Sequence, residues 1–334
     1  MKETPRAARR VFRLSSIAGL IGVGLLVVAI YLAASHAYVF TDWLRLRNYQ
    51  PAARVSELAQ QTTMTDTSRH LFYLNRPGIE DKATFSQSCA RMGEQTIVLG
   101  CYKGGQRGIH VLAVEDDRLQ GVEQVTAAHE MLHAAYERLN RTERQRVDAM
   151  LQDYADHDLT NERIKKALKA YEQSEPGQQY NEMHSMFGTE IDKLPDGLEQ
   201  YYKRYFSNRR AVVAYANRYQ SAFTLRQEAV ANYDKQLKTM NATIKANTTD
   251  LTVRQKAIEA EAQRLDGLRS NGNIQAYNGG VDGYNTQIDD YNQLLDATQL
   301  LIDQYNDIVK VRNGIAAETV DLQQAIDSSS LTKK

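Results

Sequence analysis

The chain has 334 residues, 42% of them hydrophobic and 25% charged, so it is long enough to form about two domains with a buried core. Its 41 basic and 41 acidic residues give a formal net charge of zero. This balance argues against a nucleic-acid-binding protein, which normally carries a basic excess, and we expect no nucleic-acid partner.

An uncharged stretch near the N-terminus predicts a membrane anchor. Residues 14–34 read LSSIAGLIGVGLLVVAIYLAA, and about 20 apolar residues suffice to cross a bilayer. Basic residues in segment 1–13 precede it, which places that segment in the cytoplasm. We therefore expect a single transmembrane helix over 14–36 in the bacterial cytoplasmic membrane, with the lipid bilayer as a partner and the remainder outside the cytoplasm. A cleaved signal peptide, with SHA before Tyr38 as a weak cleavage site, is the alternative.

The segment that follows predicts the start of a small α+β domain over 45–206. Residues 52–61 form a helical pattern after Pro51, and HLFYLN (70–75) is interpreted as a strand followed by an NRPG turn. The segments QTIVLGCYK (95–103) and GIHVLAV (108–114) predict two strands, joined by GGQR as a hairpin.

The two cysteines, Cys89 and Cys101, are separated by a predicted turn and strand. A disulfide is permitted if the domain lies outside the cytoplasm, and we expect one between them. Two buried free thiols are the alternative. The chain contains no CxxC, which argues against a metal site made of cysteines.

Helical patterns continue to about residue 206. Expected helices cover 122–139, 140–154, about 160–173, a shorter piece at 180–187 ending at Gly188, and a segment after Pro195. Thr142 and Gln145 are a candidate capping box for the second of these. The segment DYADHD (153–158) is interpreted as a solvated loop.

Residues 207–327 predict an antiparallel coiled-coil hairpin, followed by a disordered tail at 328–334. Two sets of residues recur every seven positions on either side of the RSNGN break at 269–273, which favours two helices folded back on each other. We expect this hairpin to recruit partners, to mediate self-association or to hold the domain off the membrane. The first set is Phe223, Val230, Leu237, Ile244, Leu251, Ile258 and Leu265; the second is Tyr277, Tyr284, Tyr291 and Tyr305, with Val281, Ile288, Leu295, Ile302 and Val309 four residues after that frame.

The motif HEMLH, at 129–133, predicts a zinc site. His129 and His133 are four residues apart, so on a helix they share one face and can converge on one ion. Glu130 lies one step around the helix, where it can act as the general base that activates a zinc-bound water. The alternative is two ordinary histidines on an amphipathic helix, although the uncharged residues around the motif favour a helix buried behind a metal.

This helix and its upstream strands resemble the zincin superfamily of metallopeptidases over about residues 65–200. The resemblance implies a third protein ligand from a downstream helix, and Asn181-Glu182 matches the Asn-Glu pair of the gluzincin branch. Glu182 is therefore the expected ligand. Glu190 and His184 are alternatives, and Asp192 is a further one because GTEID resembles the aspzincin pattern. Met186 stands where that branch often has an Asp that orients a ligand histidine, so the match is partial.

The segments LAQQTTMTDTSRHLFYLNRP, HEMLHAAYERL and NEMHSMFGTE, with the Tyr-Asn-rich coiled coil, also resemble single-pass bacterial membrane proteins of unassigned activity. Together these features predict a membrane-anchored, zinc-dependent metallopeptidase of α+β class that hydrolyses peptide bonds outside the cytoplasmic membrane. Its substrate would be a peptide or protein, with cell-wall peptide as one option. The alternative is an envelope scaffold protein whose coiled coil is the functional part and whose zinc site is structural or inactive.

Overall fold

The structure is a computed structural model that describes residues 26–27, 37–89, 99–174 and 176–327. It divides into two compact units: one takes in the described residues up to Ala113 together with Glu123–Val213, and the other takes in Val114–Val122 and the described residues from Ala214 onward. The predicted anchor at 14–36, apart from residues 26–27, and the predicted tail at 328–334 lie outside the described residues. Among the residues that are described, no helix has the length and apolar character needed to cross a membrane.

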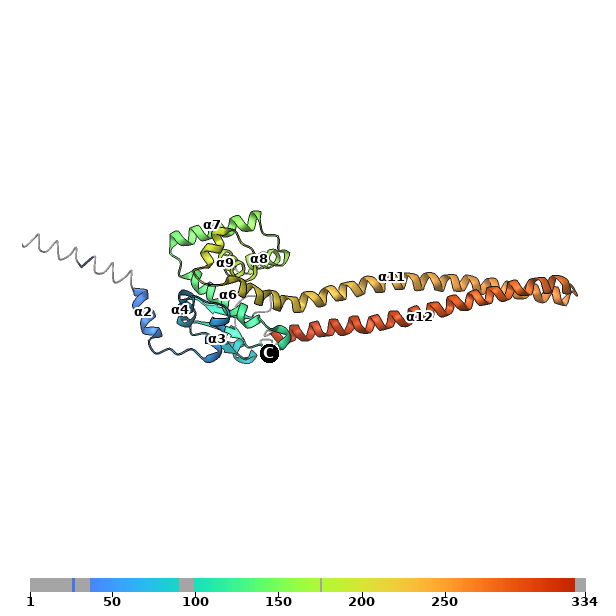
Figure 1. Cartoon of the computed structure of the whole chain (residues 1–334), viewed down its shortest axis with the longest axis horizontal. Coiled ribbons are helices and arrows are strands. Elements are labelled where there is room, and N and C mark those ends of the chain that lie inside the picture. Colours follow the sequence, from blue (N-terminus) through green and yellow to red (C-terminus); the bar gives the residue numbers. More distant parts are fainter. Residues whose placement is uncertain (1–25, 28–36, 90–98, 175, 328–334) are drawn as a thin grey trace, which may run out of the picture. The chain divides into compact units, whose positions relative to one another are not determined.

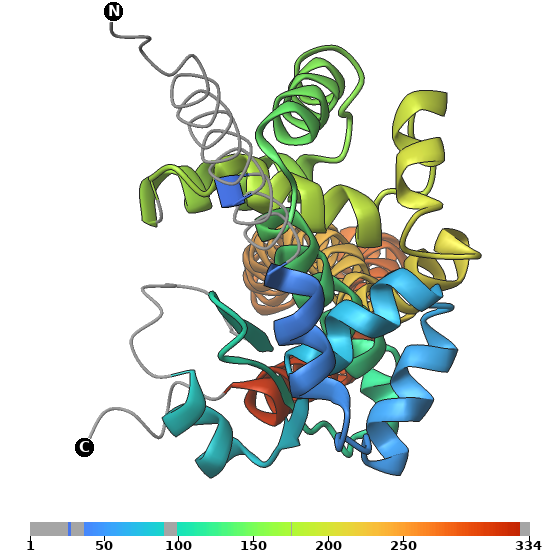
Figure 2. The same ribbon diagram turned by 90° about the vertical axis from the view of Figure 1, so that its left-hand side faces the viewer.

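Three helices open the first unit: α2 (Ala37–Leu46), α3 (Ala53–Gln61) and α4 (Asp66–Leu74). In Figures 1 and 2, α2 lies beside α4. The strand expected at 70–75 is wrong, because residues 70–74 belong to α4 and Asn75 is its C-cap. Thr65 caps that helix by accepting a hydrogen bond from the Ser68 amide, and Ser68, Leu71 and Phe72 are buried at helical spacing.

A three-stranded sheet follows, in the order β1-β3-β2. Strand β1 (Gly78–Glu80) runs parallel to β3 (Gly108–Leu112), while β2 (Gly100–Lys103) is antiparallel to β3, which confirms the predicted hairpin. The sequence did not predict β1 or the short helix α5 (Lys82–Ser88). Cys89 and Cys101 form a disulfide bond that ties the end of α5 to β2.

Helix α6 (Val122–Glu137) carries the HEMLH motif through the middle of the first unit. Its side chains at 127, 128, 131, 132, 134 and 135 are almost fully buried. They belong to one continuous apolar core that includes residues of β3 and of the later helices. The uncharged surroundings of the motif therefore reflect burial on nearly all sides of the helix.

Helices α7 (Arg141–His157) and α8 (Glu162–Ser174) continue this unit. The capping box of α7 is formed by Asn140 and Glu143, not by the expected Thr142 and Gln145, because the helix starts two residues earlier than that assignment requires. Residues 153–157 are the last turn of α7, so the loop expected there is also wrong. The side chains of Asp153 and His157 are solvated, as expected.

Helix α9 (Gln179–Glu190) does not end at Gly188 as expected, but passes through it. A Cβ atom at Gly188 would lie 2.5 Å from Leu132 Cδ1 and 2.7 Å from Tyr202 Cε1. Here glycine lets α9 approach α6 and α10 (Asp196–Tyr202) closely. This close approach places the α9 side chains beside the HEMLH motif.

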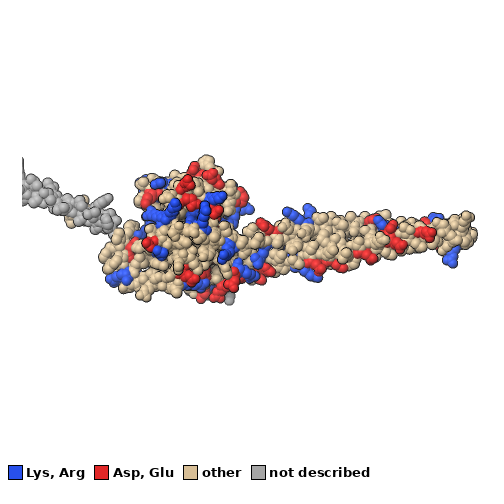
Figure 3. Space-filling model, in the orientation of Figure 1, with Lys and Arg blue, Asp and Glu red and all other residues tan. Residues whose placement is uncertain are grey.

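The second unit is dominated by α11 (Arg209–Ser270), of which residues from 214 belong to it, and α12 (Ile274–Ile326). They run antiparallel as a long hairpin in Figure 1, which confirms that prediction, and Figure 3 shows both signs of charge spread along its surface. Pairs that step outward from the turn set the register: Asn247 with Thr298, Asp234 with Arg312, and Arg226 with Glu318.

The first heptad set, Phe223 to Leu265, faces inward along its whole length, as expected. The second set is only partly right. Leu295 is 42% exposed, and Thr298 fills the tyrosine frame with its side chain buried. At the start of this unit, a 3₁₀ helix (Asp117–Leu119) precedes Gly121, whose φ of 102° allows it to lie against the Tyr215 backbone.

Candidate metal centre

Helices α6 and α9 bring His129, His133 and Glu182 together. Each of these residues offers one ligand atom, and the three atoms all lie within 4.8 Å of one another. The Glu182 carboxylate contacts both imidazoles, at 3.7 Å from His129 Nε2 and 3.6 Å from His133 Nε2. Two atoms bound tetrahedrally to one zinc ion lie about 3.4 Å apart, so little movement would complete a shared site.

The polar atoms of the triad also fit a metal. His133 and Glu182 are buried, and His129 is mostly so, with 18% of its side chain exposed. The oxygen Glu182 Oε2 is buried and finds no hydrogen-bond donor in the described structure. A buried carboxylate oxygen without a donor is costly, and a cation between it and the imidazoles would remove that cost.

Two residues of α9 orient His133. Its Nδ1 lies 3.0 Å from Asn181 Oδ1 and 3.2 Å from Ser185 Oγ. Asn181 donates from Nδ2 to Gln178 Oε1, which directs the amide oxygen toward the imidazole. His133 then donates from Nδ1, and its Nε2 lone pair is left for a cation. The position Met186, at which the family pattern suggested an orienting acid, is a buried core residue instead.

From sequence, Asn181 was expected only as part of the Asn-Glu pair, and Ser185 was not predicted as a site residue. A signal for both was present: positions 181 and 185 are one turn apart and flank Glu182 on the same helix. Since a ligand histidine usually donates its second N–H to an acceptor, an amide or hydroxyl at those positions could have been expected to orient it.

Burial and neighbouring charges shift the pKa values of the three side chains in the triad. Burial acts to lower the pKa of His129, but the Glu182 and Glu130 carboxylates raise it to about 9. Burial lowers the pKa of His133. The pKa of Glu182 is raised by burial but lowered more strongly by the two histidines, so its net shift is downward. These shifts favour a proton on His129 and an ionised Glu182 near neutral pH.

The alternative ligands lie elsewhere. His184 projects from the other side of α9, with its Nε2 2.8 Å from the Tyr201 hydroxyl, and burial lowers its pKa to about 3. Glu190 pairs with Arg163 of α8. Asp192 is exposed after the end of α9. In the part of the chain that the structure describes, the triad is the only group of three such side chains close enough to share an ion.

Glu130 lies beneath strand β2. A Cβ atom at Gly100 would lie 2.8 Å from Glu130 Oε1 and 2.9 Å from its Cγ, and would also clash with Thr126. The absence of a side chain at Gly100 therefore makes room for the Glu130 carboxylate between α6 and the sheet. In the described structure β2 pairs only with β3, so its other side forms an edge near this carboxylate.

Comparison with known proteins gives no further assignment: no family model matches the chain, and neither the curated proteins nor the solved structures include a match to it.

Proposed function

We propose that the protein is a zinc-dependent peptidase anchored in the bacterial cytoplasmic membrane, with His129, His133 and Glu182 as the metal ligands. The convergence of these three side chains from two helices is the observation that supports the proposal most strongly. Bound there, Zn²⁺ would supply a Lewis acid and lower the pKa of a coordinated water.

The protein's own residues would then accept a proton, orient a ligand and align the substrate. Glu130 follows the first ligand in the motif and would accept the proton of the attacking water. Asn181 and Ser185 hold the His133 ring in place through its Nδ1. A substrate peptide extended along the edge of β2 would pass near Glu130, with main-chain hydrogen bonds aligning it. The proposed substrates are peptides or proteins outside the cytoplasm, cell-wall peptide included.

The test compares the zinc-loaded full chain with Glu130→Gln on a peptide library and on purified peptidoglycan. We expect Glu130→Gln to bind zinc with unchanged stoichiometry and to lose at least about a hundredfold in hydrolysis, the lower end of what a positioned acid-base group contributes. Glu162→Gln, which removes an exposed carboxylate on α8, is the matched control and should keep full activity.

Two results would argue for other functions. If wild type binds zinc but hydrolyses neither substrate, the peptidase proposal is wrong and the envelope scaffold, with a structural metal and the α11–α12 hairpin as its functional part, becomes the better account. Cleavage of peptidoglycan alone would identify an amidase acting on cell-wall peptide.

A further inference from the structure

One side of helix α2 is fixed to the first unit. Asp42 is buried and accepts hydrogen bonds from both terminal nitrogens of Arg138, at 2.8 and 3.1 Å, and it lies 3.2 Å from His70 Nε2. The Arg138 guanidinium also lies 4.8 Å from the centre of the Tyr38 ring. These contacts join α2 to α4 and to the residue that follows α6, so the helix presents a fixed face to its surroundings.

The other side of α2 is apolar and exposed. Val39 is 66% exposed, Phe40 64% and Trp43 58%, and the Phe40 and Trp43 rings stack with their centres 6.1 Å apart. From residue 37 onward, every exposed large hydrophobic side chain that the structure describes in this unit lies on α2. An exposed cluster of large apolar side chains of this kind indicates an interaction site.

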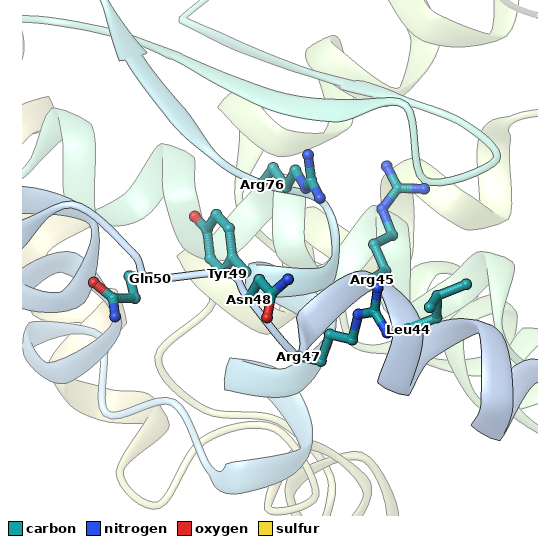
Figure 4. A pocket seen from close by; sticks show the side chains of 7 residues that line it. All are labelled: Leu44, Arg45, Arg47, Asn48, Tyr49, Gln50 and Arg76. Atoms are coloured by element: carbon teal, nitrogen blue, oxygen red, sulfur yellow. The ribbon is translucent and has the colours of Figure 1, made fainter.

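A basic pocket adjoins the C-terminal end of this face, where three arginines gather around it in Figure 4. Arg45 and Arg47 come from the end of α2 and the residues after it, and Arg76 follows α4. The polar side chains of Asn48, Tyr49 and Gln50 also line the pocket, and no acidic residue does.

The arginines of this pocket are not neutralised within the described structure. None of the three guanidinium groups lies within ion-pair distance of a carboxylate in the ranges the structure describes. Arg45 donates to the Gln106 backbone carbonyl, while its Nε is buried without an acceptor. Arg47 lies over the Trp43 ring, 5.8 Å from its centre. Guanidinium groups in this state suit a phosphate, which accepts several of their hydrogen bonds at once.

The apolar face and the pocket match the two parts of a membrane surface. Aromatic side chains are favoured at the boundary between lipid and water, and arginines are attracted to anionic headgroups. In the sequence, the uncharged stretch 14–34 ends just before α2 begins at Ala37. We propose that the exposed face of α2 lies at the interface between water and the outer leaflet of the cytoplasmic membrane, and that Arg45, Arg47 and Arg76 bind the phosphate of an anionic phospholipid. This contact does not depend on the metal centre, and it would hold the first unit against the bilayer.

Trp43 is the only tryptophan in the chain, so its fluorescence reports on α2 alone. The full chain is reconstituted in vesicles of phosphatidylcholine, with or without phosphatidylglycerol, and brominated acyl chains serve as the quencher. We expect quenching of Trp43 at a shallow depth, stronger with phosphatidylglycerol and weaker in high salt. Each arginine should multiply the ratio of docked to undocked helix about fivefold.

The double variant Arg47→Gln/Arg76→Gln tests the pocket while leaving Arg45 and its bond to Gln106 intact. It should lower the docked ratio about twenty-five fold in phosphatidylglycerol vesicles. Arg69→Gln, which removes an exposed arginine paired with Asp66, is the control and should match wild type.

Three outcomes would overturn the proposal. The first is unquenched Trp43 in both lipid mixtures. The second is quenching that is equal in the two mixtures and unchanged in the double variant. The third is docking to phosphatidylcholine vesicles that rises to the level seen with phosphatidylglycerol when free inorganic phosphate is added. That result would identify the pocket as a site for the soluble anion.

Discussion

At the scale of single residues, neighbouring side chains direct the candidate ligand atoms of the triad. Asn181 and Ser185 contribute nothing to the ligand set, yet their contacts fix which nitrogen of His133 faces Glu182. Without an acceptor at Nδ1, the imidazole could rotate or adopt the other tautomer, and its Nε2 lone pair would no longer be held ready for a cation.

Asn181→Ala should therefore weaken zinc binding about 10- to 100-fold, the usual effect of losing a partner behind a ligand histidine. The measurement is competition for zinc against a chelator of known affinity. Gln178→Ala, which removes only the partner of the Asn181 amide, should have a smaller effect. Equal affinity in Asn181→Ala and wild type would show that His133 needs no such orientation.

Asp42 gives a residue-scale test of how α2 is attached. Burial raises the pKa of Asp42, but its bonds to Arg138 and His70 lower it more. The net effect is a pKa below the ordinary value of 3.8. A carboxyl with a lowered folded-state pKa adds stability above its unfolded value, and this stability is lost as the pH falls through the folded-state pKa.

We accordingly expect α2 to loosen only below about pH 3.8, and Trp43 emission in detergent solution to report a transition there. Asp42→Asn should lack this transition and should hold α2 less firmly at neutral pH. A transition of the same size and midpoint in the variant would assign it to other groups.

At the scale of the elements, the approach of α9 to α6 determines whether the triad can form. Gly188→Ala would place a methyl group against Leu132 and Tyr202, and overpacking of this kind costs about 1–3 kcal/mol. The gain in helix propensity, about 1 kcal/mol, offsets only part of that cost. We expect a lower free energy of unfolding and weaker zinc binding, measured by chemical denaturation and by competition with a chelator.

Gly283→Ala is the matched control, because it adds a methyl group inside α12, past its first turns, with nothing within 4 Å. That change should stabilise its helix by up to about 1 kcal/mol and leave zinc affinity unchanged. If Gly188→Ala behaves like this control, the two helices do not need to be so close.

Some helices and strands could be predicted from the sequence and others could not. HEMLH and the heptads were recognisable because a fixed spacing places their residues on one face of a helix. Helix α4 was mistaken for a strand because a window of six residues, rich in aromatic and apolar side chains, is too short to separate the two periodicities. Strand β1 has only three residues and pairs in parallel with a strand about 30 positions later. No local sequence pattern therefore predicts it.

At the scale of the whole molecule, the candidate metal centre lies in one compact unit and most of the helical hairpin in the other. A zinc ion that binds only the folded form of the first unit stabilises that unit by about 2.7 kcal/mol when its free concentration is 100 times the dissociation constant. Zinc binding to the first unit does not contribute to the stability of the hairpin in this linkage.

Removal of zinc should therefore lower one calorimetric transition of the full chain by about 5–10 °C, at 2–4 °C for each kcal/mol, and leave the hairpin transition unchanged. His133→Ala, which removes a proposed ligand, should show no response to zinc or chelator. A chelator that moved both transitions equally, or neither, would be incompatible with a metal centre confined to the first unit.

The proposed ligand set could be predicted only in part from sequence. Two of its members lie four residues apart on one helix, whereas Glu182 reaches them from a helix about 50 positions later. The choice among Glu182, His184 and Glu190 depends on which face of α9 meets α6, and that is fixed by the packing of Gly188 and by the contacts of His184 with its tyrosines. Such packing depends on tertiary structure and has no signature in the spacing alone.

The central claim is most directly tested by X-ray absorption at the zinc edge on the loaded full chain, with metal content measured on the same sample. We predict one zinc per chain, coordinated by two imidazole nitrogens and by oxygen atoms only, with binding lost or greatly weakened in Glu182→Gln. A chain that takes up no stoichiometric zinc, or a metal shell that contains a third imidazole and is unchanged in Glu182→Gln, would contradict the proposed centre.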